Sequence, residues 1–257
     1  MTAIFFVALA VFVYVSLGFI TALFLKRNDI ADVMWGPGIF LVSLVSFVVS
    51  GGGEILLLGL VFLWACRIAF HIGARFFSKK EEDFRYETWR KTWKYFYVRS
   101  YLQVFLLQGF LMMLVASGFV TLALYNVVPT TALLYVGVGV ALCALLFETV
   151  ADMQLKEFLR QNRGGIMRAG VWKYSRHPNY FGEVTFWWGL CIAGVSLQSS
   201  LMVNLLLLVS PLTITFLILY VSGIPMLERK YAGNQEFEEY KATTNAFFPW
   251  FPKSNSN

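Results

Sequence analysis

The chain has 257 residues and a net charge of +6, and 58% of its residues are hydrophobic while only 14% are charged. Soluble domains carry nearer ~25% charged residues, so this composition excludes an ordinary soluble domain and predicts an integral membrane protein. The chain has three cysteines, far apart in apolar stretches, and two histidines, which argues against a disulfide framework and against a metal centre.

Seven apolar stretches follow one another along the chain, and most approach the ~20 residues that a helix needs to cross hydrocarbon. They cover residues 3–25, 31–50, 55–76, 101–125, 131–153, 179–197 and 201–222. The first stretch is followed, not preceded, by basic residues, which is the reverse of a cleaved signal peptide. The sequence therefore predicts an all-α, polytopic membrane protein of about seven transmembrane helices, with one domain over residues 1–257.

Basic residues gather on one side when the loops between these stretches are assigned alternately to two sides of a membrane. Twenty of the 21 Lys and Arg residues lie in loops 26–30, 77–100 and 154–178, in the C-terminal tail, or at span ends facing that side. The exception is Arg67, which lies inside a span. The positive-inside rule then places the N-terminus outside and the C-terminus in the cytoplasm. The net charge reflects topology and anionic-lipid contact, and nucleic-acid binding is not expected.

The loop 77–100 mixes basic side chains with seven aromatic ones. One interpretation is an interfacial segment whose Lys and Arg side chains extend along apolar surface toward water. The sharper alternative is that Arg85 or Arg90 also reaches a bound phosphate.

Five charged residues lie inside or at the edge of the predicted spans, where a charge costs at least ~2.5–3.5 kcal/mol on insertion scales. They are Asp32, Arg67, Glu148, Asp152 and Glu183. One interpretation is a set of buried ion pairs that fix helix packing, for example between Arg67 and Asp32. Because the charges come from at least four spans, we favour a polar pocket that opens to the cytoplasm. Glu148 and Asp152 share one face of their helix.

The segment Arg176-His-Pro-Asn-Tyr-Phe-Gly-Glu183 opens the sixth apolar stretch. Pro178 suits the first turn of a helix, and a helix that begins there places Asn179 and Glu183 on one face. The donor-rich loop 154–178 and the helix N-terminus together predict binding of an anionic cofactor such as a dinucleotide. Side chains and helix ends would hold it, because the sequence has no GxGxxG or Walker pattern. The alternative for a basic loop is lipid-headgroup contact, and a single histidine is more often structural.

Several segments together resemble a known family. They read Asp32-Val-Met-Trp-Gly36, Glu148-Thr-Val-Ala-Asp152-Met-Gln154, Gly170 to Glu183, Leu227-Glu228-Arg-Lys-Tyr231 and Phe248-Pro249. On these segments the chain resembles the steroid 5α-reductase-like superfamily, and it is more similar to that superfamily's uncharacterised bacterial membrane branch. The wider clan includes sterol reductases and isoprenylcysteine or phospholipid methyltransferases.

The resemblance implies a cytoplasm-facing pocket that holds NADPH, with the Asn-x-x-Gly-Glu element of the reductases at Asn179, Gly182 and Glu183. The expected cofactor-binding residues are Glu148, Asp152, Gln154, Arg160, Trp172, Tyr174, Ser175, Arg176, His177, Asn179, Tyr180, Glu183, Glu228 and Tyr231. The steroid enzymes also carry a Gln-Glu pair on an early span and a Tyr on the next. Neither is found here, where the corresponding region reads Met34-Trp-Gly-Pro37.

We therefore expect an NADPH-dependent reductase of a carbon–carbon double bond in a lipophilic, steroid- or isoprenoid-like substrate. Asp32, Arg67 and Glu183 are the candidate acids or electrostatic partners of the substrate. The expected location is a bacterial inner membrane, with membrane lipids as partners and the active site facing the cytoplasm. The alternative hypothesis is an S-adenosylmethionine-dependent methyltransferase of a lipid or isoprenylcysteine. A third hypothesis is a channel or scaffold without enzymatic activity.

The predicted topology can be tested with reporters. We expect a reporter inserted at Gly52 to read external and a reporter fused after Asn257 to read cytoplasmic, because the basic loops lie on the side of the C-terminus. A cytoplasmic signal at Gly52 would refute the seven-span topology.

Overall fold

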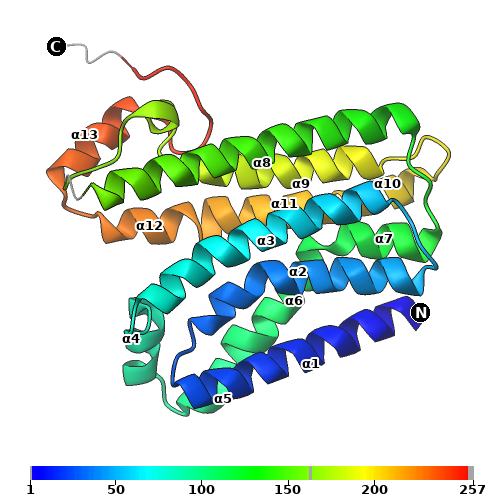
Figure 1. Cartoon of the computed structure of the whole chain (residues 1–257), viewed down its shortest axis with the longest axis horizontal. Coiled ribbons are helices and arrows are strands. Elements are labelled where there is room, and N and C mark those ends of the chain that lie inside the picture. Colours follow the sequence, from blue (N-terminus) through cyan, green and yellow to red (C-terminus); the bar gives the residue numbers. More distant parts are fainter. Residues whose placement is uncertain (1, 162–163, 254–257) are drawn as a thin grey trace. The chain divides into compact units, whose positions relative to one another are not determined.

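The computed structural model describes residues 2–161 and 164–253, and these residues form helices joined by loops, without a strand among them (Figure 1). The chain, which we expected to form one domain, divides into two compact units. Unit 1 comprises Met1–Thr130 and Gly194–Ser210, and unit 2 comprises Thr131–Ala193 and Pro211–Asn257.

Unit 1 is a bundle in which α2 (Ile30–Val49) contacts α1 (Thr2–Leu25), α3 (Ile55–Ser78), α6 (Leu107–Val115) and α7 (Ser117–Tyr125). The short helices α4 (Phe84–Thr92) and α5 (Phe96–Ser100) precede a π-helix, η1 (Tyr101–Leu106), that runs into α6. α10 (Leu201–Leu207) packs on α7. The side chain of Asp83 caps α4 by accepting a hydrogen bond from the Arg85 N–H, at 3.1 Å.

Unit 2 is built on the long helix α8 (Thr131–Arg160). A 3₁₀ turn, η2 (Gly170–Lys173), precedes α9 (Pro178–Gly194), which begins at the proline as the sequence predicted. α11 (Val209–Phe216) starts in unit 1 and continues into unit 2 as the π-helix η3 (Leu217–Val221). α12 (Ile224–Lys230) and α13 (Gln235–Thr243) complete the unit.

Six helical segments are long and apolar enough to cross a membrane. They are Ile4–Leu25, Ile30–Val49, Ile55–Ser78, Phe96–Val115, Thr131–Arg160 and Leu201–Lys230. They match six of the seven predicted spans, and the remaining one corresponds to α9, which has 17 residues. The chain is therefore an all-α, polytopic integral membrane protein.

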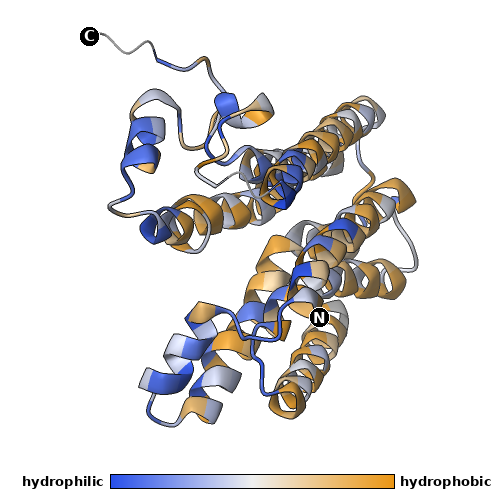
Figure 2. Cartoon of the chain, turned by 60° about the vertical axis from the view of Figure 1, so that its left-hand side comes forward, coloured by the Kyte–Doolittle hydropathy of each residue, from blue (hydrophilic) through white to orange (hydrophobic). Residues whose placement is uncertain are grey.

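The surface of these helices is apolar where a lipid environment requires it. Large side chains such as Phe24, Phe70 and Phe77 are 83%, 74% and 80% exposed. Figure 2 shows hydrophobic residues along the long helices, and hydrophilic residues gathered at α4 and α13. Exposed phenylalanine at this density suits hydrocarbon, because side chains facing lipid tails lose nothing by being apolar.

Glycines bring α8 and α9 into close contact. A Cβ atom on Gly137 of α8 would lie 2.3 Å from the backbone N of Ala193, and one on Gly189 of α9 would lie 2.7 Å from the backbone N of Ala141. Hydrophobicity does not drive helices together within lipid, so association depends on the close packing that small residues permit.

This contact generates a prediction with an internal control. We expect Gly137→Ala to destabilise the protein by ~1–3 kcal/mol, because the added methyl group overpacks the interface with α9. Gly139→Ala, two residues along the same helix, should be neutral or stabilising, because nothing lies within 4 Å of its Cβ position. The measurement is the thermal unfolding midpoint in detergent. Equal midpoints for the two variants would contradict the packing argument.

Candidate functional site

The polar residues predicted at the start of α9 meet those of α8 within unit 2. The side-chain amide of Asn179 donates a hydrogen bond to the Oδ1 of Asp152, at 3.2 Å, which confirms the expected approach of these two residues. Glu148, Asp152 and Glu183 are all buried, with 3%, 8% and 7% of their surface exposed. Such burial is costly for carboxylates and marks the group as a candidate site.

Gly182 explains how the two helices come close enough for this contact. A Cβ atom at Gly182 would lie 2.6 Å from the Cβ of Glu148 and 3.0 Å from its backbone N. Any larger residue would force α9 away from α8 at the level of the carboxylates. The Asn-x-x-Gly-Glu element therefore has a packing requirement at its glycine, in addition to any role in binding.

A second cluster, the Arg176 cluster, consists of Arg176, His177 and Glu228. The Oε1 of Glu228 accepts hydrogen bonds from the Nε and Nη2 of Arg176, at 2.9 and 2.7 Å. The Nε2 of His177 lies 3.1 Å from the same oxygen. The Nη1 of Arg176 donates to the backbone carbonyl of Thr244. Arg176 thus joins α12 and the segment after α13 to the start of α9.

The C-terminal segment is also held by backbone contacts. The Ser175 hydroxyl donates to the carbonyl of Phe247, at 2.8 Å, and the Tyr174 carbonyl accepts from the Trp250 N–H, at 2.9 Å. Tyr240 of α13 donates its hydroxyl to the carbonyls of Trp172 and Ser175. Tyr174 and Ser175, predicted as cofactor residues, are therefore part of the bracing of this segment.

The remaining predicted cofactor residues fall into three environments. The Gln154 Oε1 accepts from the Val171 N–H, and the Trp172 Nε1 donates to the Ala151 carbonyl, both at 3.0 Å, so the two side chains fix the loop against α8. Two aromatic residues are stacked on neighbours, and Arg160 is exposed and paired with Glu157. The stacked pairs are Tyr180 with His177 and Tyr231 with Phe237.

In unit 1, Asp32 belongs to a group that the sequence did not predict, the Asp32 group, formed by Asp32, Arg85 and Tyr86. The Nη2 of Arg85 donates to the Oδ2 of Asp32 at 2.6 Å, and the Tyr86 hydroxyl donates to its Oδ1 at 2.7 Å. The ion-pair interpretation of the sequence named Arg67 as an example of a partner for Asp32, and the structure adds Arg85 and Tyr86 as partners of this carboxylate. The loop helix α4 supplies the partner because its capping residue, Asp83, turns Arg85 toward α2.

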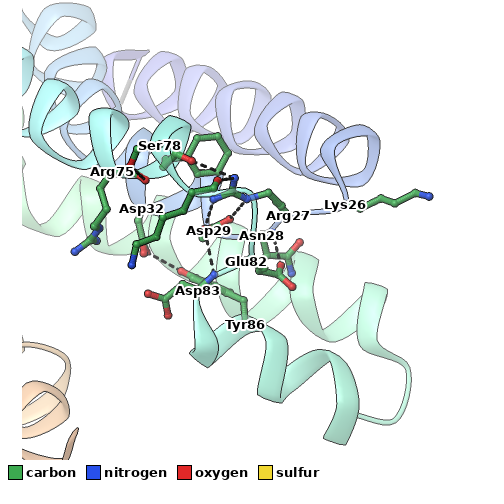
Figure 3. A network of polar contacts seen from close by, with 12 residues as sticks. Lys26, Arg27, Asn28, Asp29, Asp32, Arg75, Ser78, Glu82, Asp83 and Tyr86 are labelled. Carbon is green, nitrogen blue, oxygen red and sulfur yellow. Dashed lines mark hydrogen bonds and ion pairs between the residues drawn. The ribbon is translucent and has the colours of Figure 1, made fainter. Parts of the chain in front are cut away.

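A neighbouring network ties the loop between α1 and α2 to the start of α4 (Figure 3). Arg27 pairs with Asp29 at 2.8 Å and donates to the carbonyls of Phe76 and Lys79. The Oδ2 of Asp29, which pairs with Arg27, also accepts from the Asp83 N–H, at 3.2 Å. Asp83 also accepts a hydrogen bond from the Nε of Arg85, so the network holds the Asp32 group in place.

The charges of the Asp32 group shift the titration of the residues on α4. Burial raises the pKa of Tyr86 well above its usual value, and the adjacent Asp32 carboxylate raises it further. Burial would also raise the pKa of Asp83, but hydrogen bonds from Arg85 outweigh it and keep that pKa below its usual value. Burial would lower the pKa of Arg85, and the two carboxylates keep it above its usual value instead. Tyr86 therefore keeps its hydroxyl proton at neutral pH.

Of the three candidate catalytic residues, Asp32 and Arg67 belong to unit 1 and Glu183 belongs to unit 2. Arg67 is half-buried on α3, and Glu183 is buried one helical turn after Asn179. Sequence reasoning missed Tyr86 and Arg85 as partners of Asp32. The sequence did contain a signal for the helix α4. Asp83 is a residue type that often caps the start of a helix, and the cation Arg85 follows two residues later.

The raised pKa of Tyr86 gives an alkaline pH dependence with a definite sign. Above the usual tyrosine pKa of 10.0 the unfolded chain loses this proton while the folded chain keeps it, so stability falls as the pH rises. We expect Tyr86→Phe to make the free energy of unfolding less dependent on pH between about pH 9 and about pH 11. At neutral pH the same variant should lose ~1.5–3 kcal/mol, because Asp32 loses a hydrogen bond.

The measurement is denaturant unfolding in detergent at several pH values. Tyr95→Phe is the matched control, since Tyr95 is 72% exposed and its substitution should leave stability at neutral pH unchanged. A Tyr86→Phe variant with the parental alkaline slope would contradict the assignment.

Comparisons with known proteins place the chain in a family but do not name an activity. No curated protein and no solved structure matches it significantly. One family model matches residues 18–244, which include the Asp32 group, the carboxylates of α8 and the Arg176 cluster. Its description is "protein of unknown function (DUF1295)". The chain belongs to the DUF1295 family.

Proposed function

We propose that the protein is an NADPH-dependent membrane reductase of a carbon–carbon double bond in a lipophilic, steroid- or isoprenoid-like substrate. The observation that carries the proposal is the meeting of Asp152 and Asn179, at 3.2 Å, among buried carboxylates at the start of α9. Two further acids, Glu148 and Glu183, are buried on the same two helices. Buried titratable side chains gathered at one place are typical of a binding or catalytic site, and they support the proposal.

The chemistry of the donor set fits a dinucleotide. The carboxylates of α8 and α9 are acceptors for hydroxyl and carboxamide donors, and Asn179 can both donate and accept. Exposed cations, Lys156 and Lys173, lie on the segments that adjoin these acceptors and suit a pyrophosphate. When bound, NADPH supplies the reducing equivalent for the double bond.

The residues of this chain would divide the remaining work. Asn179, Asp152 and Glu183 would orient the cofactor, which is worth most when the side chains are held rigidly before binding. Gln154 and Trp172 would keep the loop in place through their bonds to backbone groups. Arg176, bound to Glu228 and Thr244, would fix the start of α9.

The Asp32 group would act on the substrate oxygen. Asp32 accepts hydrogen bonds from the Nη2 of Arg85 and from the Tyr86 hydroxyl, so the Arg85 guanidinium is held in a fixed position. A fixed hydrogen-bond donor of this kind stabilises negative charge as it develops on an oxygen, without reorganising in the transition state. Arg67 and Glu183 stay alternative candidates for this task.

The proposal places the protein in a bacterial inner membrane, with its active site facing the cytoplasm. The support is the asymmetry of the basic residues, since 20 of the 21 Lys and Arg residues lie on the side assigned to the cytoplasm.

A methyltransferase that uses S-adenosylmethionine is the second candidate. The observation that favours it is the Arg176 cluster, because the wider clan shares an Arg-His-Pro element and this element is bonded here to Glu228. A thermal-shift experiment separates the two candidates.

We expect NADPH to raise the unfolding temperature of the detergent-solubilised protein, because a ligand that binds the folded state stabilises it by mass action. S-adenosylmethionine should have a weak effect or none. Asn179→Ala and Glu183→Gln should weaken NADPH binding by roughly ten- to a hundredfold, as expected for a lost hydrogen bond to a charged or buried partner.

The control is Glu238→Gln, which changes an exposed carboxylate on α13 of the same unit and should bind NADPH like the parent. Each variant is checked for monodispersity before titration. A larger shift with S-adenosylmethionine than with NADPH would favour the methyltransferase. Parental NADPH affinity in both site variants would mean that these residues serve helix packing.

A further inference from the structure

A cavity of about 530 Å³ lies at the end of α1 in unit 1. It is lined by Leu23, Lys26, Arg90 and Tyr97. None of these residues belongs to the Asp32 group or to the proposed cofactor site. The cavity combines two cations and a phenol with an aliphatic side chain, which is the combination found where a membrane helix leaves the hydrocarbon.

Lys26 ends α1 in a conformation that lysine rarely adopts. Its φ is +55°, and hydrogen bonds from Lys26 N to Leu23 O and from Arg27 N to Ala22 O close the helix in a Schellman motif. Glycine is the usual residue at this position because a side chain there is strained. The helix end alone therefore gives no reason for a lysine.

The ammonium group of Lys26 is directed away from the polar network around Asp29 (Figure 3). The residue is exposed, and its Nζ makes no hydrogen bond or ion pair within residues 2–161 and 164–253. Its backbone carbonyl, by contrast, accepts a hydrogen bond from the Nη2 of Arg90, at 3.3 Å. The main chain of Lys26 is fixed next to Arg90 while the charge of Lys26 remains unneutralised.

Arg90 is held in position by Glu82. The Nε and Nη2 atoms of Arg90 donate to the two carboxylate oxygens of Glu82, at 2.9 and 2.8 Å, and the guanidinium lies 4.4 Å from the centre of the Phe96 ring. Its Nη1 makes no hydrogen bond with the part of the chain that the structure describes. The carboxylate of Glu82 neutralises the charge of Arg90, so the residues that line the cavity retain one net positive charge, that of Lys26.

The surroundings of the cavity are those of a membrane–water interface. Leu23 is in the last turn of the span Ile4–Leu25 and is 42% exposed, next to Phe24 at 83%. Tyr97 is 62% exposed at the start of the span Phe96–Val115. Both spans therefore meet the interface at the cavity, and the cations lie just beyond the apolar residues.

We propose that this cavity binds the phosphate group of an anionic phospholipid, with Lys26 and Arg90 on the phosphate and an acyl chain running along the end of α1 past Leu23. A lipid is favoured over a free phosphate because the lining includes Leu23 and continues into an exposed apolar helix face. Cations and phenols at the ends of spans are the groups that anionic headgroups meet.

Native mass spectrometry of the detergent-solubilised protein tests the proposal. The probes are phosphatidylglycerol and phosphatidylcholine with identical acyl chains, and inorganic phosphate as a competitor. We expect phosphatidylglycerol to bind in preference to phosphatidylcholine and to resist a tenfold excess (about ten equivalents) of inorganic phosphate. Lys26→Gln should weaken phosphatidylglycerol binding by about tenfold, because a charge-assisted hydrogen bond is lost.

Lys94→Gln is the matched control, because it removes one exposed positive charge from the neighbouring α4–α5 segment and should change binding by less than about twofold. Lys26→Gly is a second variant that removes the ammonium and suits the left-handed backbone, so it should fold and still lose the lipid. Equal losses in Lys26→Gln and Lys94→Gln would show general surface attraction and overturn the proposal. Displacement by inorganic phosphate, or equal binding of phosphatidylcholine, would overturn it as well.

Discussion

The structure depends on one constraint, which is that polar groups within or beside hydrocarbon must find their partners inside the protein. Both polar regions obey it at the ends of long apolar helices. Asp32 at the start of α2 accepts hydrogen bonds from Arg85 and Tyr86, and Asp152 near the end of α8 accepts one from Asn179. Losing a hydrogen bond to a charged group typically costs ~1.5–3 kcal/mol, so these residues cannot be replaced singly without a penalty.

Close helix packing is the second consequence of the same environment. Because apolar surface gains nothing by leaving lipid, α8 and α9 associate through backbone approach at Gly137 and Gly189. Gly182 allows the same close contact between the two helices at Glu148, which is one of the buried acids of the candidate site. The geometry of the candidate site is therefore fixed by the same glycine contacts that hold the two helices together.

Hydropathy and charge asymmetry predicted the spans, and the start of α9 was predictable from Pro178, because both signals are local in sequence. The meeting of Asp152 with Asn179 also followed from helical spacing and the resemblance. The partner of Asp32 did not, since Arg85 lies 53 residues away on a loop helix whose direction depends on the Asp83 cap. The sequence likewise could not separate residues that brace the chain, such as Arg176, from those free to meet a ligand. That distinction rests on contacts between distant segments.

The Arg176 cluster shows why such bracing belongs beside a binding site. Arg176 is 8% exposed, and a guanidinium at that depth requires a carboxylate, which Glu228 of α12 provides. Its Nη1 donates to the backbone carbonyl of Thr244, so one side chain joins three separate segments of unit 2. The first turn of α9, and with it Asn179, is therefore positioned by residues far along the chain. If Asn179 contacts a cofactor as proposed, α12 and the segment after α13 contribute to affinity through preorganisation, without touching the ligand.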